Sequence, residues 1–98
     1  MSLFTPLVLP NGTVMSNRIA KAAMEENMAD EDHAPSLPLL QLYQAWAEGE
    51  AGLILTGNVM VDARAMTGPG GVVLEDERHL DRFSAWAAAG RSRGAQMW

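Results

Sequence analysis

Gly-Leu-Ile-Leu-Thr-Gly-Asn-Val-Met-Val, residues 52–61, is the part of this 98-residue sequence that decides the fold. Its first half is apolar, without any alternation of apolar and polar residues. Such a run is typical of a strand that is buried on both faces, as the strands of parallel sheets are. We therefore expect a strand over residues 53–58 and an α/β structure around it.

Helical patterns lie on both sides of this strand. The sequence predicts helices near 37–48 and 77–92, the second opened by the acidic residues at 75–77. Ser36 would cap the first helix, ahead of a proline in its first turn. Each helix carries an apolar stripe at helical spacing, formed by Leu39, Tyr43, Trp46 and Ala47 in the first and by Leu80, Phe83, Trp86 and Ala87 in the second.

Further strands are expected toward both ends of the chain. Asn11-Gly12 separates two apolar runs within residues 7–15 and predicts a β-hairpin, because both residues tolerate the positive φ of a tight turn. Residues 19–24 form a short apolar run that we interpret as a strand, and residues 95–98 look like the start of another. Strands that alternate with helices imply right-handed crossovers and a parallel sheet.

The composition limits the kinds of function to consider. The formal net charge of -5 disfavours nucleic acid or an anionic membrane as a partner, because both attract basic surfaces. There is no cysteine, which excludes disulfides, thiolate metal sites and a thiol nucleophile. The two histidines, His33 and His79, lack metal-ligand spacing, so we expect no metal site. No segment reads as a membrane span or a secretory signal, and we expect a cytoplasmic protein.

Residues 1–98 are expected to be an incomplete segment of one larger domain. A few parallel strands with two helices make a poor core, since the outer edges of the strands are left unpaired. The last predicted strand also begins where this sequence stops.

Several short motifs, taken together in their order and spacing, resemble the opening of NADH:flavin oxidoreductases of the old yellow enzyme family. They are Leu3-Phe4-x-Pro6-Leu7, Asn17-Arg18-Ile19 ahead of Ala22-Ala23-Met24, Leu42-Tyr43, Gly49-x-Ala51-Gly52-Leu53-Ile54, Thr56-Gly57-Asn58-Val59 and Asp76-x-Arg78-His79-Leu80. The resemblance implies the N-terminal part of a (β/α)8 TIM barrel with a capping β-hairpin. Active sites of such barrels lie at the C-terminal ends of the strands.

By this resemblance, residues just after the first two barrel strands contact an FMN cofactor. The candidate contacts are Ala22, Ala23, Met24 and Glu25 from the first strand and Gly57 and Asn58 from the second. Small residues let the main chain approach the flat isoalloxazine ring, and the Asn58 amide can donate to flavin O4 or accept from N3–H. The plainer alternatives, a tight strand packed on a helix and an asparagine that ends a strand, stay open.

Glu25 departs from the family pattern, which most often has Thr or Cys at this position. An ionised carboxylate only accepts hydrogen bonds, so beside the flavin it would oppose reduction and lower the potential. A protonated carboxyl would donate instead, and the side chain could also turn to solvent as part of the acidic loop at 25–36. The sequence leaves all three arrangements open.

The chemistry that the resemblance implies is hydride transfer from NADH or NADPH through FMN to an electron-poor alkene or a related small-molecule acceptor. Asn27 would face the substrate, and His33 would line the mouth of the site. The residues that polarise the substrate are expected outside this sequence, so no catalytic residue is assigned in it. The alternatives are a non-catalytic fragment or half-barrel that needs a complementary chain or a homo-oligomer partner, and a related flavin barrel with an added iron–sulfur domain.

Overall fold

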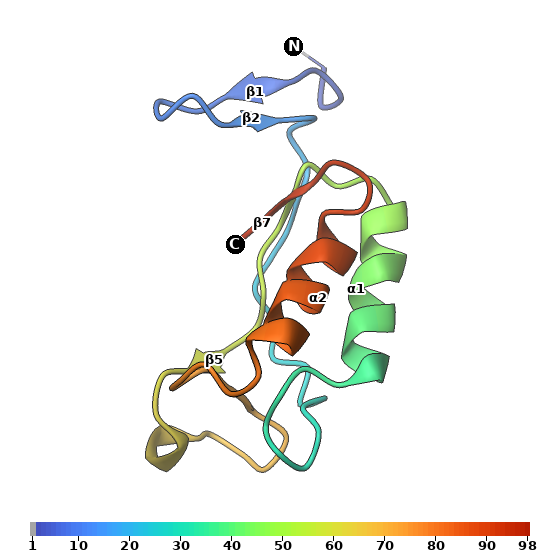
Figure 1. Ribbon diagram of the computed structural model, residues 1–98. Coiled ribbons are helices and arrows are strands. Elements are labelled where there is room, and N and C mark those ends of the chain that lie inside the picture. The colour runs from blue at the N-terminus through green and yellow to red at the C-terminus, as the bar shows by residue number, and fades with distance from the viewer. Residues whose placement is uncertain (1) are drawn as a thin grey trace.

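The computed structural model describes residues 2–98, in which two helices lie side by side against a layer of short strands (Figure 1). In chain order the elements are β1 (Leu7–Val8), β2 (Val14–Met15), β3 (Ala20–Lys21), α1 (Leu37–Glu48), β4 (Leu53–Ile54), β5 (Val59–Met60), the 3-10 helix η1 (Ala63–Ala65), β6 (Val72–Val73), α2 (Leu80–Gly90) and β7 (Gln96–Met97). None of the helices in the described residues is long and apolar enough to cross a membrane.

The central sheet is parallel and has the order β3-β4-β7. In its register, Leu53 of β4 pairs with Ala20 of β3 on one side and with Gln96 of β7 on the other. The run at 95–98, predicted as the start of a strand, therefore contains the third strand. The predicted β-α-β-α-β order and the parallel pairing are both confirmed.

The sheet strands are shorter than the sequence predicted. Residues 19–24 and 53–58 were each expected to be strands, whereas the ladder covers only Ala20–Lys21 and Leu53–Ile54. Pairing continues a little further, because the N–H of Leu55 donates to the carbonyl of Lys21 at 3.1 Å. On the other side of β4, the N–H of Thr56 donates to the carbonyl of Trp98 at 2.8 Å. The residues that follow these last bonds supply the candidate site.

The hairpin predicted at 7–15 is confirmed, since β1 and β2 pair antiparallel. Its turn differs from the expected one. The N–H of Gly12 donates to the carbonyl of Leu9 at 2.9 Å, and the N–H of Leu9 donates to the carbonyl of Thr13 at 2.8 Å. Gly12 has φ +88°, but Asn11 does not have a positive φ. This pattern matches a three-residue loop that ends in a left-handed glycine.

Asn17 joins the hairpin to the sheet. Its side chain is buried, and its Nδ2 donates to the carbonyl of Glu50 at 2.6 Å. Its Oδ1 accepts from the N–H groups of Ile19 at 3.0 Å and Gly52 at 2.8 Å. A Cβ on Gly52 would stand only 2.4 Å from the Asn17 carbonyl oxygen, so position 52 requires glycine.

Helix α1 has the predicted bounds. The Ser36 hydroxyl accepts from the N–H of Leu39 at 3.1 Å, which satisfies one of the free donors at the helix start. The two helices pack on each other and on β4, so the predicted stripes do face the strands. The buried core consists of Leu39, Tyr43, Ala47, Ile54, Val72, Trp86 and Ala95.

The predicted start of the second helix was wrong, because α2 begins at Leu80. The acidic residues at 75–77 do not form its first turn. Asp76 instead accepts from the N–H of Arg78 at 3.0 Å and pairs with the Arg78 guanidinium at 2.9 Å. Local bonds of this kind compete with helix formation. The predicted stripe is also too long at this end, since Leu80 is 45% exposed whereas Trp86 is buried.

The connection between β4 and α2 contains structure that no sequence pattern predicted. β5 and β6 pair in parallel as a separate two-stranded sheet, and η1 follows β5. The N–H of Val73 donates to the carbonyl of His33 at 2.8 Å. This bond ties the connection to the acidic loop at 25–36, so the two long loops of the molecule support each other.

Candidate functional site

The carboxyl ends of β3 and β4 lie at the end of the molecule opposite the hairpin (Figure 1). The two longest connections start there, residues 22–36 toward α1 and residues 55–79 toward α2. In parallel βα barrels the groups that bind ligands come from this end of the strands. The candidate site is therefore built from the residues just after each strand.

Two predicted site residues, Met24 and Gly57, meet through their backbones. A Cβ on Gly57 would stand 2.2 Å from the carbonyl oxygen of Met24 and 2.6 Å from a carboxylate oxygen of Glu26. Gly57 is buried, so no side chain fits between the two strand ends at this point. The structure thus brings together residues that the sequence assigned to two separate strands.

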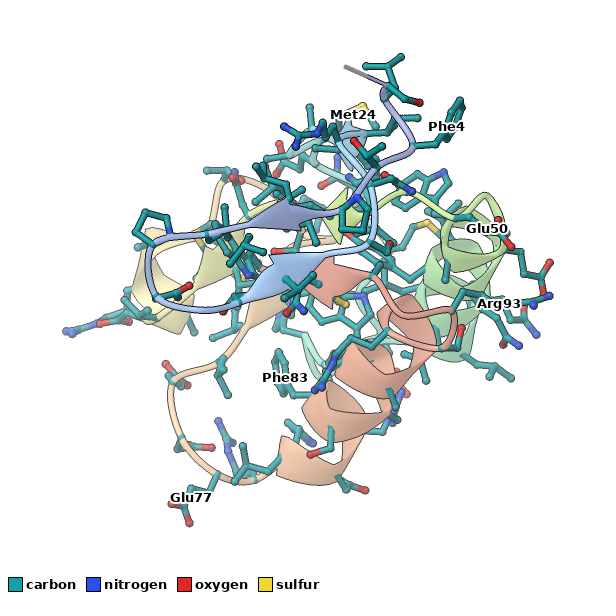
Figure 2. All side chains as sticks on the ribbon, turned by 90° about the horizontal axis from the view of Figure 1, so that it is seen from above. Phe4, Met24, Glu50, Glu77, Phe83 and Arg93 are labelled. Carbon is teal, nitrogen blue, oxygen red and sulfur yellow. The ribbon has the colours of Figure 1, made fainter. Side chains whose placement is uncertain are left out.

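The remaining predicted contacts are open to solvent. The exposed residues are Ala22, Ala23, Met24, Glu25 and Asn58. Figure 2 shows Met24 on the opposite side of the molecule from Phe83 of α2. Met24 also follows the carboxyl end of β3, and barrels of this kind bind their ligands at the carboxyl ends of the strands.

Glu26 is the central polar group at this point, and no sequence pattern singled it out. Its carboxylate accepts a hydrogen bond from the Tyr43 hydroxyl and a longer one, of 3.4 Å, from the N–H of Gly57. Burial, and then the neighbouring Glu26 carboxylate, raise the pKa of the Tyr43 phenol. The phenol therefore stays protonated and acts as a donor at neutral pH.

Lys21 supplies the opposite charge nearby. Its Nζ is buried and has no hydrogen-bond partner within residues 2–98. It lies 4.4 Å from the ring centroid of Trp46 and 5.7 Å from that of Tyr43, a cation–π arrangement. Burial lowers the pKa of the Lys21 ammonium, and the attraction of Glu26 opposes this shift.

Glu25 has a partner that the sequence did not indicate. Its Oε1 accepts a hydrogen bond from the hydroxyl of Thr67 at 2.7 Å. Thr67 belongs to the loop between η1 and β6, so that loop lies beside the candidate flavin wall. The carboxylate is exposed but held, an arrangement that differs from a side chain turned freely to solvent.

Asn27, the predicted substrate contact, is exposed and has φ +55°. Its backbone packs on Gly70, where a Cβ would stand 2.6 Å from the Asn27 carbonyl oxygen. Two residues further along the chain, the N–H of Ala29 donates to the carbonyl of Gly70 at 3.0 Å, which holds the two loops together at the same place. The glycines of the 65–71 loop thus let it approach the acidic loop closely.

A cavity of about 230 Å³ lies between the acidic loop and the start of α2. Both histidines line it, together with Asp32, Glu75 and Arg78 among others. None of the six predicted flavin contacts does so. No group of three or more His, Cys, Asp or Glu within the described part of the chain is arranged to hold a metal ion.

Curated proteins with similar sequences are flavin enzymes. The NADH-dependent flavin oxidoreductase iliE of Neonectria sp. (strain DH2) is 36% identical over 93 residues, which cover 91% of this chain and 12% of that protein. The NADH-dependent flavin oxidoreductase nadA of Aspergillus parasiticus is 36% identical over 92 residues, covering 81% of this chain and 20% of that protein. No family profile matches the chain.

Solved structures with the same fold are old yellow enzymes. The old yellow enzyme homologue from Zymomonas mobilis superposes with a TM-score of 0.87 at 21% identity, over 100% of this chain and 27% of that one. The resemblance to the old yellow enzyme family is confirmed. Morphinone reductase in complex with tetrahydroNAD gives a TM-score of 0.85 at 21% identity, over 99% of this chain and 26% of that one. The fold is that of the N-terminal part of an old yellow enzyme TIM barrel.

The similarity covers only a part of each relative. The chain spans between 12% and 24% of the length of the curated relatives that it matches. In the old yellow enzyme fold, this part includes the hairpin and the first βα units of the barrel.

Proposed function

We propose that the native protein carrying this sequence is an FMN-dependent oxidoreductase that passes hydride from NADH or NADPH to an electron-poor alkene or a related small-molecule acceptor. Residues 1–98 form the N-terminal segment of its single barrel domain and supply one wall of the flavin site. The names of the curated relatives favour NADH over NADPH as the donor.

The observation that carries the proposal is the contact between Gly57 and the Met24 carbonyl. It joins two strand ends with no side chain between them, next to the small, exposed residues Ala22 and Ala23. A flat aromatic cofactor needs such a surface, because its polar edge is met by main-chain groups at close range. The donors and acceptors available there suit the flavin edge.

When bound, FMN supplies the hydride chemistry, and the residues of this chain bind and orient the ring. The main chain at Ala23 and Met24 would face the N5 and O4 side of the flavin, and the Asn58 amide its pyrimidine edge. Ala22 and Gly57 keep the approach open, while Glu25 places a carboxylate beside the site. Asn27 would face the substrate from the acidic loop.

The native protein, purified without added cofactor, provides the test. We expect it to be yellow, to release FMN on denaturation and to oxidise NADH in the presence of 2-cyclohexenone. A colourless protein that binds no added FMN would overturn the proposal, whatever its activity toward other substrates.

Residues 1–98 alone should not perform the reaction. Most contacts to the FMN phosphate and the groups that polarise the substrate are expected from other parts of the barrel. We therefore expect no measurable flavin-dependent turnover from a preparation whose intact mass matches these 98 residues. Cell fractionation would check the cytoplasmic location that we propose for the native protein.

A further inference from the structure

Glu26 connects three separate elements through one carboxylate. The side chain starts in the segment after β3, reaches the Tyr43 hydroxyl on α1 and also accepts from the N–H of Gly57 after β4. A single acidic group thus contacts both strand ends and the helix between them. The backbone N–H of Gly57 also lies near the Tyr43 hydroxyl, where it opposes the rise in the pKa of that phenol.

Tyr43 gives this connection a fixed anchor. Its side chain is fully buried, and its ring makes edge contacts with Trp46 at 5.0 Å and Trp86 at 5.2 Å between centroids. A buried tyrosine hydroxyl needs a hydrogen-bond partner, and Glu26 is that partner. The carboxylate is therefore held in place from the core side.

A positive charge, the Lys21 ammonium, lies near the Glu26 carboxylate. The buried ammonium of Lys21 lies over Trp46 at 4.4 Å and has no hydrogen-bond partner within the described residues. Glu26 is the carboxylate that attracts it.

Glu26 directly follows two of the candidate flavin contacts, Met24 and Glu25, in the chain. Its own carboxylate also lies against Gly57, the residue that touches the Met24 carbonyl. Any change in the Glu26 side chain therefore acts on both sides of the candidate flavin wall at once. The geometry makes this residue the link between helix α1 and the cofactor surface.

We propose that Glu26 is a positioning residue of the flavin site: it holds the main chain of Met24–Glu25 and of Gly57 in the arrangement that binds FMN, without contacting the cofactor itself. This inference rests on the proposed flavin function. A residue of this kind should be replaceable by another acceptor of the same shape, but not by a truncated side chain.

The test uses the native flavoprotein and four variants, Glu26→Gln, Glu26→Ala, Tyr43→Phe and, as a matched control, Glu77→Ala. Glu77 is exposed and lies far from Met24 in Figure 2. The measurements are the FMN dissociation constant by fluorescence titration and the visible circular dichroism of the bound flavin. Far-UV circular dichroism reports whether each variant is folded.

We expect Glu26→Ala to weaken FMN binding at least about tenfold, equal to about 1.4 kcal/mol, and to change the visible dichroism. Glu26→Gln keeps an acceptor oxygen and should stay within about threefold of the parent, or about 0.7 kcal/mol. Tyr43→Phe removes the donor without changing any charge and should fall between these two. Glu77→Ala should match the parent in both measurements.

Parent-like FMN binding and dichroism in Glu26→Ala would overturn the positioning role. An equal loss in Glu26→Gln and Glu26→Ala would also overturn it, because charge and not acceptor geometry would then be decisive. If Glu26→Ala does not fold, Tyr43→Phe decides, and parent-like binding in that variant rejects the inference. A parent protein that binds no FMN would reject the proposed function and this inference together.

Discussion

Replacement of Gly57 by alanine tests how closely the two strand ends approach each other. The new Cβ would stand 2.2 Å from the carbonyl oxygen of Met24 and 2.6 Å from a carboxylate oxygen of Glu26. The Glu26 side chain can rotate away, but the carbonyl belongs to the backbone. The strand end would have to withdraw by about 1 Å to restore ordinary van der Waals separation.

The expected cost follows from overpacking, which typically destabilises proteins by about 1–3 kcal/mol. Because the clash is with backbone, we expect Gly57→Ala to lie at the upper end, at about 3 kcal/mol. Urea unfolding of the native protein measures the change as a lower midpoint with an unchanged slope. FMN binding should weaken in parallel, since the displaced carbonyl belongs to the candidate flavin wall.

Gly68→Ala is the matched control for this experiment. A Cβ at position 68 would meet only the Asn27 Oδ1, at 3.8 Å, and the glycine has no positive φ. Gly-to-Ala changes at such positions stabilise proteins by about 0.4–1 kcal/mol, because the unfolded chain loses freedom. If Gly57→Ala is no less stable than Gly68→Ala, the close approach of the strand ends is refuted.

Three further changes test separate contacts. Asn17→Ala removes the three hydrogen bonds of a buried side chain. It should lower the free energy of unfolding in urea by about 2–4 kcal/mol, and a change within error would refute the link between the hairpin and the sheet. Burial would raise the pKa of Asp30, but backbone N–H donors and the Arg82 guanidinium lower it below 3.8. The ionised Asp30 carboxylate therefore stabilises the fold above its unfolded-state pKa, and this stabilisation is lost as the pH falls through its folded-state pKa. The Asp30→Asn variant should therefore lose less stability than the parent between about pH 5 and pH 2. Glu25→Thr should raise the FMN midpoint potential by tens of millivolts in a redox titration, and a shift below about 10 mV would place the carboxylate away from the flavin.

Local signals in the sequence predicted the elements that local chemistry forms. Ser36 and the proline after it define the start of α1, because the cap and the fixed proline φ act within one turn. The predicted start of α2 was wrong because local hydrogen bonds also act there. Asp76 bonds the N–H of Arg78 and holds the chain in a turn, although acidic residues ahead of an apolar stripe usually indicate a helix start.

The sequence predicted only the part of the candidate site that lies at the strand ends. Met24 and Gly57 lie just after β3 and β4, which are neighbours in the sheet, so their proximity follows from the predicted parallel sheet. Glu26 was missed, because it stands in an acidic loop without periodicity and its partners are distant in the chain. One signal was available: Tyr43 lies on the buried face of a helix, and its hydroxyl there requires a polar partner.

The strand order β3-β4-β7 has a consequence for how the protein is made. β4 and β7 each pair with the strand of the same sheet that precedes them in the chain, so each can pack on the previous strand as it emerges from the ribosome. Within residues 2–98, β3 has a single neighbour in its sheet, β4. In a closed barrel the other edge of the first strand pairs with the last strand, the contact of greatest sequence separation and therefore the slowest to form. Until such a closure, the edge of β3 that leads into Met24 would stay open to pairing with other chains.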